Sequence, residues 1–590
     1  HSKRVRVYIT LNTDLKSSEL EDASKILKYL KDIKADAVII KDPALVYLIE
    51  KYFAPFEFHL STQFGIANSA ALSEAENLGA SRVVLARELN KEELKALNKP
   101  YFPEREMFVQ GSMCFSFSGR CLMSSWFGGK SANRGSCQAP CRFKFAQEGS
   151  DDFSPCFSMK DLNLSEKLSE LAETGISALK IEGRLKSAEW VGEITRFYRN
   201  LLDNKEADGA DPSRFTGREQ GSGFYSGLND LITNKNSGTV TNVIKSAPDD
   251  RRVRHNGYDL RITANENISI KILTEFGDAD YSTKIKKVVN ESRGIPLSEL
   301  ESRLKDVSFG NLYLNRIDVK DDILVAKSQL KNIVSDLGAI IAPMSRKESK
   351  FLRSIKLPVK LEHELNDPEP DSKNSIEVSF KNANILKINA DDIDQIADKI
   401  KELDIKKVIV NFARTSHINK IKELSNKTRV EISVFPILFE KDLEDYNRII
   451  SALEHTNNIS YEANDIGHLK LLKGTSKKID CGPGLSAYNF IAVKQLKQLG
   501  LASAHIPFEA DTETLDGLKN SPLPLRLTVF SKIPLFYTRA ASENFKEGTS
   551  FTERENYRFT VHKFNDISIF SSDDYFTIHD IDLSFLKVHE

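Results

Sequence analysis

The amino-acid sequence predicts an α/β fold in three parts: a TIM-like (β/α)8 barrel that is incomplete at its N-terminal side, a small β-barrel domain, and a second, degenerate barrel-like α/β domain. Three observations support this prediction. Short β-branched runs alternate with amphipathic helical stretches, the first part of the chain recurs near its end, and a different pattern separates the two copies. The expected boundaries are 1–205, 206–350 and 351–590 in a chain of 590 residues.

An internal repeat relates the first and third parts. The segment from His59 to Glu88 returns as the segment from Ile479 to Glu509. Three pairs coincide without a gap: Asn68 with Asn489, Gly79 with Gly500, and Glu88 with Glu509. Self-similarity of this kind indicates two copies of one domain.

Each copy is expected to build a parallel sheet with crossover helices. The first copy has predicted strands at 5–11, 37–40, 58–60, 82–85, 107–110 and 178–181, and predicted helices that include 14–30, 67–78 and 188–202. In the second copy, the strand near 431–435 is preceded by two more, at 375–380 and 406–410. Counterparts of those two would lie before Val5, so we expect the first barrel to lack its first two strands.

Between the copies, residues 237–345 form short alternating runs broken by Asn, Gly and Asp turns, which predicts a small β-barrel. The expected strands lie at 238–244, 258–262, 268–273 and 311–314. Within this part, Arg251 to His255 is a short basic run that could face RNA. Its alternative is a solvated loop, because Asp249 and Asp250 precede it.

Composition limits the functional classes. The chain carries 83 Lys and Arg against 84 Asp and Glu, so its formal net charge of -1 gives no overall basic field for nucleic acid. It has no run as long as a membrane span and no apolar signal-peptide core at its N-terminus, and we therefore expect a cytoplasmic protein. In that compartment, clustered thiols are typical of ligands or catalysts rather than disulfides.

Five of the six cysteines lie in one short tract. They are Cys114, Cys121, Cys137, Cys141 and Cys156, and the tract follows the strand predicted at 107–110. In a barrel, residues just after a strand lie at the C-terminal face, where active sites are built. Zinc favours paired Cys-x2–4-Cys spacing, whereas the uneven spacing here, with several glycines, also suits an iron–sulfur cluster.

The segments 111–125, 133–142 and 179–187 resemble the signature of the collagenase-like peptidase family U32. Several members of that family are iron–sulfur proteins that hydroxylate RNA or ubiquinone precursors. The long arrangement of this chain resembles the branch that hydroxylates a cytidine of 23S ribosomal RNA with prephenate dependence. The resemblance implies a [4Fe-4S] cluster on Cys114, Cys121 and Cys137, with Cys156 as the fourth ligand and Cys141 as its alternative.

Polar residues at the predicted strand ends complete a candidate pocket. Arg87, Glu182 and Arg184 are the candidate catalytic residues. The two arginines can grip a small dicarboxylate such as prephenate, because guanidinium matches carboxylate in a two-pronged hydrogen bond. The alternative for each is a salt bridge at the barrel rim, above all between Glu182 and Arg184. The remaining candidates are Asn12, Lys41, Ser61, Gln63, Glu88 and Gln110.

The sequence therefore predicts an iron–sulfur RNA hydroxylase with ribosomal or other structured RNA as its partner. A U32-type peptidase is the first alternative, although the chain has no His-Glu-x-x-His motif and no histidine in the cysteine tract. A non-catalytic iron–sulfur or RNA-binding assembly protein is the second. The copy that contains Cys481 has no counterpart of Cys114 and is expected to act as scaffold or RNA-docking surface.

Overall fold

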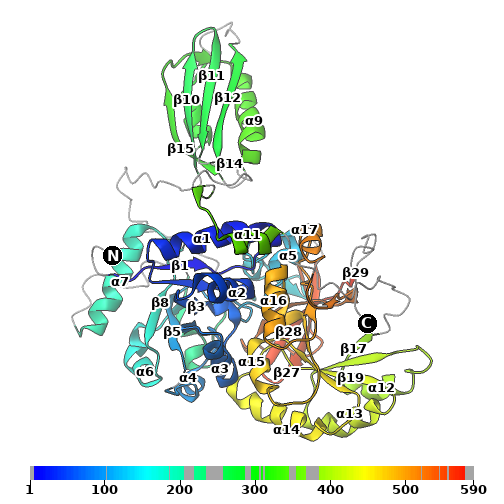
Figure 1. Cartoon of the computed structure of the whole chain (residues 1–590). Helices are drawn as coiled ribbons and strands as arrows, with labels where there is room; N and C mark the ends of the chain where they lie inside the picture. The colour runs from blue at the N-terminus through cyan, green and yellow to red at the C-terminus, as the bar shows by residue number, and fades with distance from the viewer. Residues whose placement is uncertain are drawn as a thin grey trace. The chain divides into compact units, whose positions relative to one another are not determined.

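A computed structural model describes most of residues 5–577 (Figure 1). The exceptions inside that range are 101, 185, 205–217, 234–256, 275, 286–293, 305–306, 310–311, 345–351, 353, 367–384, 520, 544 and 554–556. The chain forms two compact units. One contains both copies of the repeat, in residues 1–20, 31–242 and 360–590, and the other contains residues 21–30 and 243–359. The three-part boundaries expected from the sequence remain a prediction.

The first copy forms the parallel sheet that its pattern predicts. Its strands β1 (Tyr8–Leu11), β2 (Ala37–Ile40), β3 (Phe58–Leu60), β4 (Arg82–Val84) and β5 (Glu104–Gly111) pair in chain order, and β8 (Ala178–Ile181) pairs parallel with β5. Beyond β5 the sheet continues with β7 (Asp161–Asn163), which pairs antiparallel with β5, and then with β9 (Gln220–Gly221), which pairs parallel with β7. Within the described residues the sheet does not close, so the (β/α)8 barrel stays a prediction.

Helices follow the strands of this copy in the expected order. They are α1 (Leu20–Asp32), α2 (Pro43–Leu48), α3 (Ser69–Asn77), α4 (Lys91–Ala96), α6 (Leu168–Glu173) and α7 (Ala188–Leu202). Side-chain caps define several starts: Asp42 accepts a hydrogen bond from the Ala44 amide, and Asn68 accepts one from the Ala71 amide. These caps place each helix directly after its strand.

The second copy repeats this arrangement. Its parallel sheet runs through β17 (Ile385–Asn389), β18 (Lys407–Asn411), β19 (Arg429–Ser433), β20 (Ile459–Ala463) and β21 (Ile479–Cys481). A further pair, β22 (Ala504–His505) with β23 (Leu525–Arg526), follows. Two strands do precede the counterpart of β1, which is β19. The first of them lies at 385–389, whereas the predicted strand 375–380 lies outside the described residues.

The two copies pack through equivalent helices. Helix α3 packs on α15 (Ile466–Leu471), and α2 packs on α16 (Phe490–Gln498), as Figure 1 shows. The matching asparagines take part on both sides: Asn68 Nδ2 donates to the Leu438 carbonyl at 2.7 Å, and Asn489 Nδ2 donates to the Leu15 carbonyl at 2.9 Å. The interface is therefore reciprocal, with each patch of one copy facing the related patch of the other.

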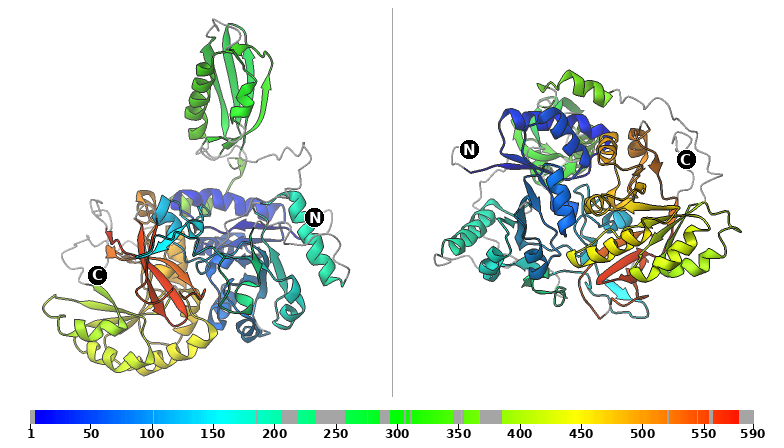
Figure 2. Two further views of the ribbon diagram at one scale, coloured as in Figure 1. Left: turned by 180° about the vertical axis from the view of Figure 1, so that it is seen from behind. Right: turned by 60° about the horizontal axis from the view of Figure 1, so that its bottom comes forward.

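A third sheet joins the end of the chain to the cysteine tract. Its order is β25 (Pro534–Thr538), β28 (Ile567–Ser572), β27 (Arg558–Phe564), β26 (Ser550–Glu553) and β6 (Phe145–Gln147), and β6 comes from the first copy (Figure 2). An aromatic core packs around it, consisting of Phe115, Phe145, Phe157, Phe536, Phe545, Phe551, Phe559 and Phe570. All eight side chains are buried.

The other unit is built on a five-stranded sheet. Its strands are β12 (Gly277–Lys284), β11 (Asn267–Thr274), β10 (Gly257–Ala264), β15 (Leu312–Val319) and β14 (Ser308–Phe309), in that order. Among the described residues this sheet is open rather than the small barrel that we expected. Helix α9 (Lys327–Met344) shares the apolar core with β10 and β11 and covers it without barrel closure. The predicted strand 238–244 and the basic run 251–255 lie outside the described residues.

Candidate functional site

The cysteine tract begins three residues after β5, at the carboxyl end of the first parallel sheet. Backbone hydrogen bonds then lay it along β25: the Phe117 amide donates to the Tyr537 carbonyl at 2.6 Å, and the Leu122 amide donates to the Leu535 carbonyl at 3.0 Å. Parallel sheets collect their functional loops at this end. The tract is thus held where the sequence predicted a site, and the last sheet of the chain supports it.

Gly119 lets the tract close onto the loop that follows β3. Its φ is +76°, and a Cβ there would lie 2.0 Å from the Gln63 carbonyl oxygen. Only glycine fits so close an approach in this left-handed conformation. The contact brings the tract against Gln63, one of the polar residues predicted at a strand end.

Four thiols of the tract lie close enough to influence one another. Cys114 and Cys137 keep exposed surface, and Cys121 and Cys141 are half-buried. Desolvation, with repulsion from Cys141, raises the pKa of the Cys114 thiol to about 12. Desolvation and repulsion from Cys114, Cys141 and Cys137 raise the pKa of Cys121 well above its usual value.

Cys156 is set apart from this group. Desolvation alone raises the pKa of its thiol to about 12, and no other cysteine contributes. Cys141, in contrast, is affected by Cys137 and itself affects Cys114 and Cys121. Cys141 therefore interacts electrostatically with the other three thiols, and the choice between Cys156 and Cys141 as fourth ligand stays a prediction.

The cysteine thiols of the tract are chemically suitable ligands for an iron–sulfur cluster. Thiolates are the ligands of such clusters, and bound cations would offset the desolvation and the repulsion that raise these pKa values. Across the described residues, no three His, Cys, Asp or Glu side chains already lie in the arrangement of a metal site. The tract supplies suitable ligands that have not converged on one point.

The three candidate catalytic residues lie around the end of β5. Arg87 donates to the Ser112 carbonyl at 2.7 Å, its guanidinium covers the Phe108 ring at 3.9 Å, and its Nη2 lies 3.5 Å from Glu182 Oε2. Glu182 thus pairs with Arg87 rather than with Arg184. Arg184 is exposed, and its Nη2 lies 3.9 Å from a Cβ built on Gly135 in the tract. Both arginines border the cysteine tract.

Glu88 is buried beside the same tract. Its carboxylate accepts hydrogen bonds from the Ser118 amide at 3.1 Å and from the Ser118 hydroxyl. Burial raises the pKa of Glu88 to about 7. Lys41 pairs with Asp14, and Gln110 accepts a hydrogen bond from the Tyr198 hydroxyl at 3.0 Å.

Glu509, the counterpart of Glu88, reaches from the second copy into the cysteine tract. It accepts hydrogen bonds from the hydroxyls of Ser125 and Ser131 and, at 3.4 Å, from the Asn133 amide. The Tyr488 hydroxyl donates to it at 2.9 Å. The sequence match with Glu88 marks this position in both copies, but it does not reveal the contact between them.

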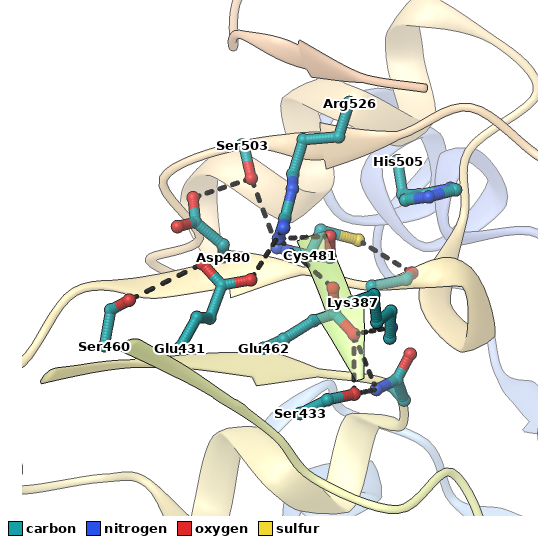
Figure 3. A network of polar contacts seen from close by, with 12 residues as sticks. Lys387, Glu431, Ser433, Ser460, Glu462, Asp480, Cys481, Ser503, His505 and Arg526 are labelled. Atoms are coloured by element: carbon teal, nitrogen blue, oxygen red, sulfur yellow. Dashed lines mark hydrogen bonds and ion pairs between the residues drawn. The ribbon is translucent and has the colours of Figure 1, made fainter. Parts of the chain in front are cut away.

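The second copy holds a charged network that sequence reasoning did not find (Figure 3). Arg526 Nη2 bonds Glu431 at 2.6 Å, and its Nη1 lies 3.4 Å from Glu462. Lys407 bonds Glu431 at 2.8 Å, and Lys387 bonds Glu462 at 2.6 Å. Burial opposes ionisation of Glu462, but Lys387 and Arg526 lower its pKa to about 2. These side chains point from successive strands to one side of the sheet.

The network borders a cavity of about 1500 Å³. Residues of the first copy complete its wall, among them Gln63, Arg120 and Asn133. Asn133 Nδ2 also donates to the Cys121 carbonyl at 3.1 Å. The cavity of the second copy therefore reaches the cysteine tract of the first.

The comparison with known families gives one match. Residues 1–231 match the model of peptidase family U32. The match includes β1 to β9, the complete cysteine tract and the three candidate catalytic residues.

Three curated relatives show which kinds of protein this part of the chain is similar to. The chain is 35% identical over 269 residues to tRNA hydroxylation protein P of Helicobacter pylori, which is 42% of this chain and 60% of that protein. It is 33% identical to 23S rRNA 5-hydroxycytidine C2501 synthase of Escherichia coli, over 34% of this chain and 31% of that protein. It is 29% identical to a collagenase of Porphyromonas gingivalis, over 34% of this chain and 52% of that protein.

The chain thus spans between about a third and three fifths of each of these relatives. No solved structure matches it. Among the described helices, none combines the length and the apolar character needed to cross a bilayer.

Proposed function

We propose that the protein is an iron–sulfur RNA hydroxylase that acts on a cytidine of 23S ribosomal RNA with prephenate dependence. The observation that carries the proposal is the cysteine tract at the carboxyl end of β5, inside the segment that resembles proteins named for RNA hydroxylation. Relatives named for tRNA hydroxylation and for 23S rRNA hydroxycytidine synthesis both match, and the choice of the ribosomal substrate rests on the resemblance of the long arrangement to that branch.

In this proposal, Cys114, Cys121 and Cys137 hold a [4Fe-4S] cluster, which would supply redox chemistry to the hydroxylation. Cys156 is the expected fourth ligand and Cys141 its alternative; Cys141 contributes to the raised pKa values of Cys114 and Cys121, whereas no other cysteine contributes to that of Cys156. The two variants Cys141→Ser and Cys156→Ser separate these possibilities.

In this proposal, Arg87 and Arg184 bind the carboxylates of a dicarboxylate such as prephenate. Arg184 is exposed, and its guanidinium can form a two-pronged hydrogen bond with a carboxylate. Glu182 positions Arg87 through their ion pair, and the Arg87 guanidinium packs against the face of the Phe108 ring. Binding of a carboxylate to Arg87 would weaken its pairing with Glu182.

Peptidase activity, after which the family is named, has less support. A cysteine nucleophile needs a lowered thiol pKa, and burial raises the pKa of Cys114, Cys121, Cys141 and Cys156 instead. Cleavage of gelatin by the intact protein, abolished by Cys114→Ser, would restore that alternative.

The test begins with anaerobically purified protein. We expect a brown protein with iron and sulfide, and loss of both in Cys114→Ser and Cys121→Ser. Cys481→Ser is the matched control, because Cys481 is buried in the second copy and donates to the Leu485 carbonyl. A colourless wild-type protein that contains zinc would overturn the cluster.

The substrate is tested in cells. Mass analysis of ribosomal RNA from a deletion strain should show the loss of one oxygen atom at a pyrimidine, restored by the wild-type gene and not by Cys114→Ser. An unchanged modification profile would contradict ribosomal RNA as substrate. A profile that Cys114→Ser restores would indicate a non-catalytic assembly role.

A further inference from the structure

The cavity of the second copy is larger than a typical small-molecule pocket. Pockets for small molecules enclose about 300–1,000 Å³, and this one encloses about 1500 Å³. Most of its lining residues belong to the second copy, and residues of the first copy complete the wall.

The cavity is positive in a chain that has a formal net charge of -1. Nine Lys or Arg and six Asp or Glu side chains line it. Inside, Lys387, Lys407 and Arg526 are paired with buried carboxylates. On the rim, Arg429 is exposed and Lys532 lies over an aromatic ring, so these cations are available to phosphates.

Two exposed aromatic side chains stand together at the cavity. Phe530 is 61% exposed and Tyr575 is 54% exposed, and their rings stack at 4.5 Å with an interplanar angle of 14°. Lys532 Nζ lies 5.3 Å from the Tyr575 ring. Exposed rings beside cations are the arrangement on which unpaired bases stack.

Polar atoms on the cavity wall lack partners within the described residues. His505 is 4% exposed, its Nε2 lies 3.2 Å from the Thr528 hydroxyl, and its Nδ1 has no hydrogen-bond partner. Asp480 Oδ2 accepts no hydrogen bond either, although Lys407 lies 3.7 Å away. Buried polar atoms of this kind are normally satisfied by water or by a ligand.

We propose that this cavity binds a single-stranded segment of RNA, with bases stacked on Phe530 and Tyr575 and phosphates against the rim cations. His505 and Asp480 then face base edges at the cavity floor. The choice of RNA rests on the function proposed above. Because Gln63, Arg120 and Asn133 belong to the same wall, the bound strand would lead to the cysteine tract.

Binding is measured directly with a fluorescein-labelled, mixed-pyrimidine single-stranded RNA of about 12 nucleotides, by anisotropy with the intact protein. Phe530→Ala and Tyr575→Ala should each weaken binding by about fivefold or more, and the double variant further. Tyr29→Ala is the matched control, since Tyr29 is an exposed aromatic outside the cavity lining. Arg429→Gln should lower the slope of log affinity against log salt by about 0.7.

Competition identifies the occupant. Unlabelled single-stranded RNA should displace the probe, whereas a duplex of equal length should not, because its bases are already stacked. Equal displacement by polyglutamate would assign the cavity to an acidic peptide and overturn the proposal. So would wild-type affinity in the double variant, or an absence of binding by the wild type.

These outcomes are separable from those of the hydroxylase proposal. If ribosomal RNA loses no oxygen in the deletion strain but binding still depends on Phe530 and Tyr575, the RNA-binding proposal is supported and the hydroxylase proposal is contradicted. If the oxygen is lost and the Phe530→Ala, Tyr575→Ala double variant binds the RNA probe normally, the RNA-binding proposal is contradicted and the hydroxylase proposal is supported.

Discussion

Glu509 shows how one side chain of the second copy can control the order of a loop in the first. Three of its four hydrogen-bond donors, Ser125, Ser131 and Asn133, belong to the cysteine tract. We expect Glu509→Ala to leave these donors without an acceptor, to lower the free energy of unfolding by about 1–3 kcal/mol, and to reduce iron content. Denaturant unfolding and iron analysis measure both effects.

Glu76→Ala is the control for that change, because Glu76 is exposed on α3. If Glu509→Ala and Glu76→Ala behave alike in stability and iron content, the tether between copies does not order the tract.

Glu88 predicts a pH dependence of stability. Its pKa rises from 4.5 to about 7 in the folded protein because it is buried. Since the folded state holds the proton more tightly, this group's contribution is complete below about pH 4.5 and is lost as pH rises to about 7. The free energy of unfolding of Glu88→Gln, relative to that of the wild type, should therefore rise by about 3 kcal/mol as the pH goes from about 4.5 to about 7.

Urea unfolding of both proteins at about pH 5 and about pH 8 measures this difference. Glutamine can accept from the Ser118 amide as glutamate does, so the comparison isolates the charge. A constant difference at both pH values would refute the raised pKa.

At the level of helices, the packing of α3 on α15 depends on a residue without a side chain. A Cβ on Gly467 would lie 2.8 Å from the Ala71 amide nitrogen and 2.9 Å from the Ala71 Cβ. Gly467→Ala should therefore lower the free energy of unfolding by about 1–3 kcal/mol, despite the better helix propensity of alanine.

Gly192→Ala in α7 is the opposite case, because no heavy atom lies within 4 Å of its Cβ position. It should stabilise the protein by about 0.4–1 kcal/mol. Thermal and denaturant unfolding compare the two, and equal effects would show that the helices do not pack this closely.

Elements with strong local signals were predictable from sequence. The predicted strands at 37–40 and 58–60 and the helix at 188–202 match β2, β3 and α7 to the residue, because buried apolar runs and helical periodicity are local properties. Strand β6 was not predictable, since its partner β26 lies near the other end of the chain. The same holds for Glu509, whose role exists only after the copies pack.

At the scale of the whole molecule, the aromatic core connects the last sheet to the cysteine tract. Phe570 is fully buried, with its ring 5.6 Å from Phe115 and 5.3 Å from Phe157. We expect Phe570→Ala to cost about 3–5 kcal/mol and to lower iron content, although Phe570 lies outside the tract. Calorimetry and iron analysis test this expectation.

Phe530→Ala serves as the control, because Phe530 is exposed and its loss should change stability by less than about 0.5 kcal/mol. Full iron content in Phe570→Ala would mean that the tract is ordered without the last sheet.

The reciprocal packing of α3 on α15 and α2 on α16 has a consequence for how this chain can evolve. In a homodimer with such an isologous interface, every substitution enters both partners at once. Here the two partners are encoded separately, so a change in one leaves the other intact. The two copies can therefore differ: one carries the cysteine tract, and the other carries the charged network that borders the cavity.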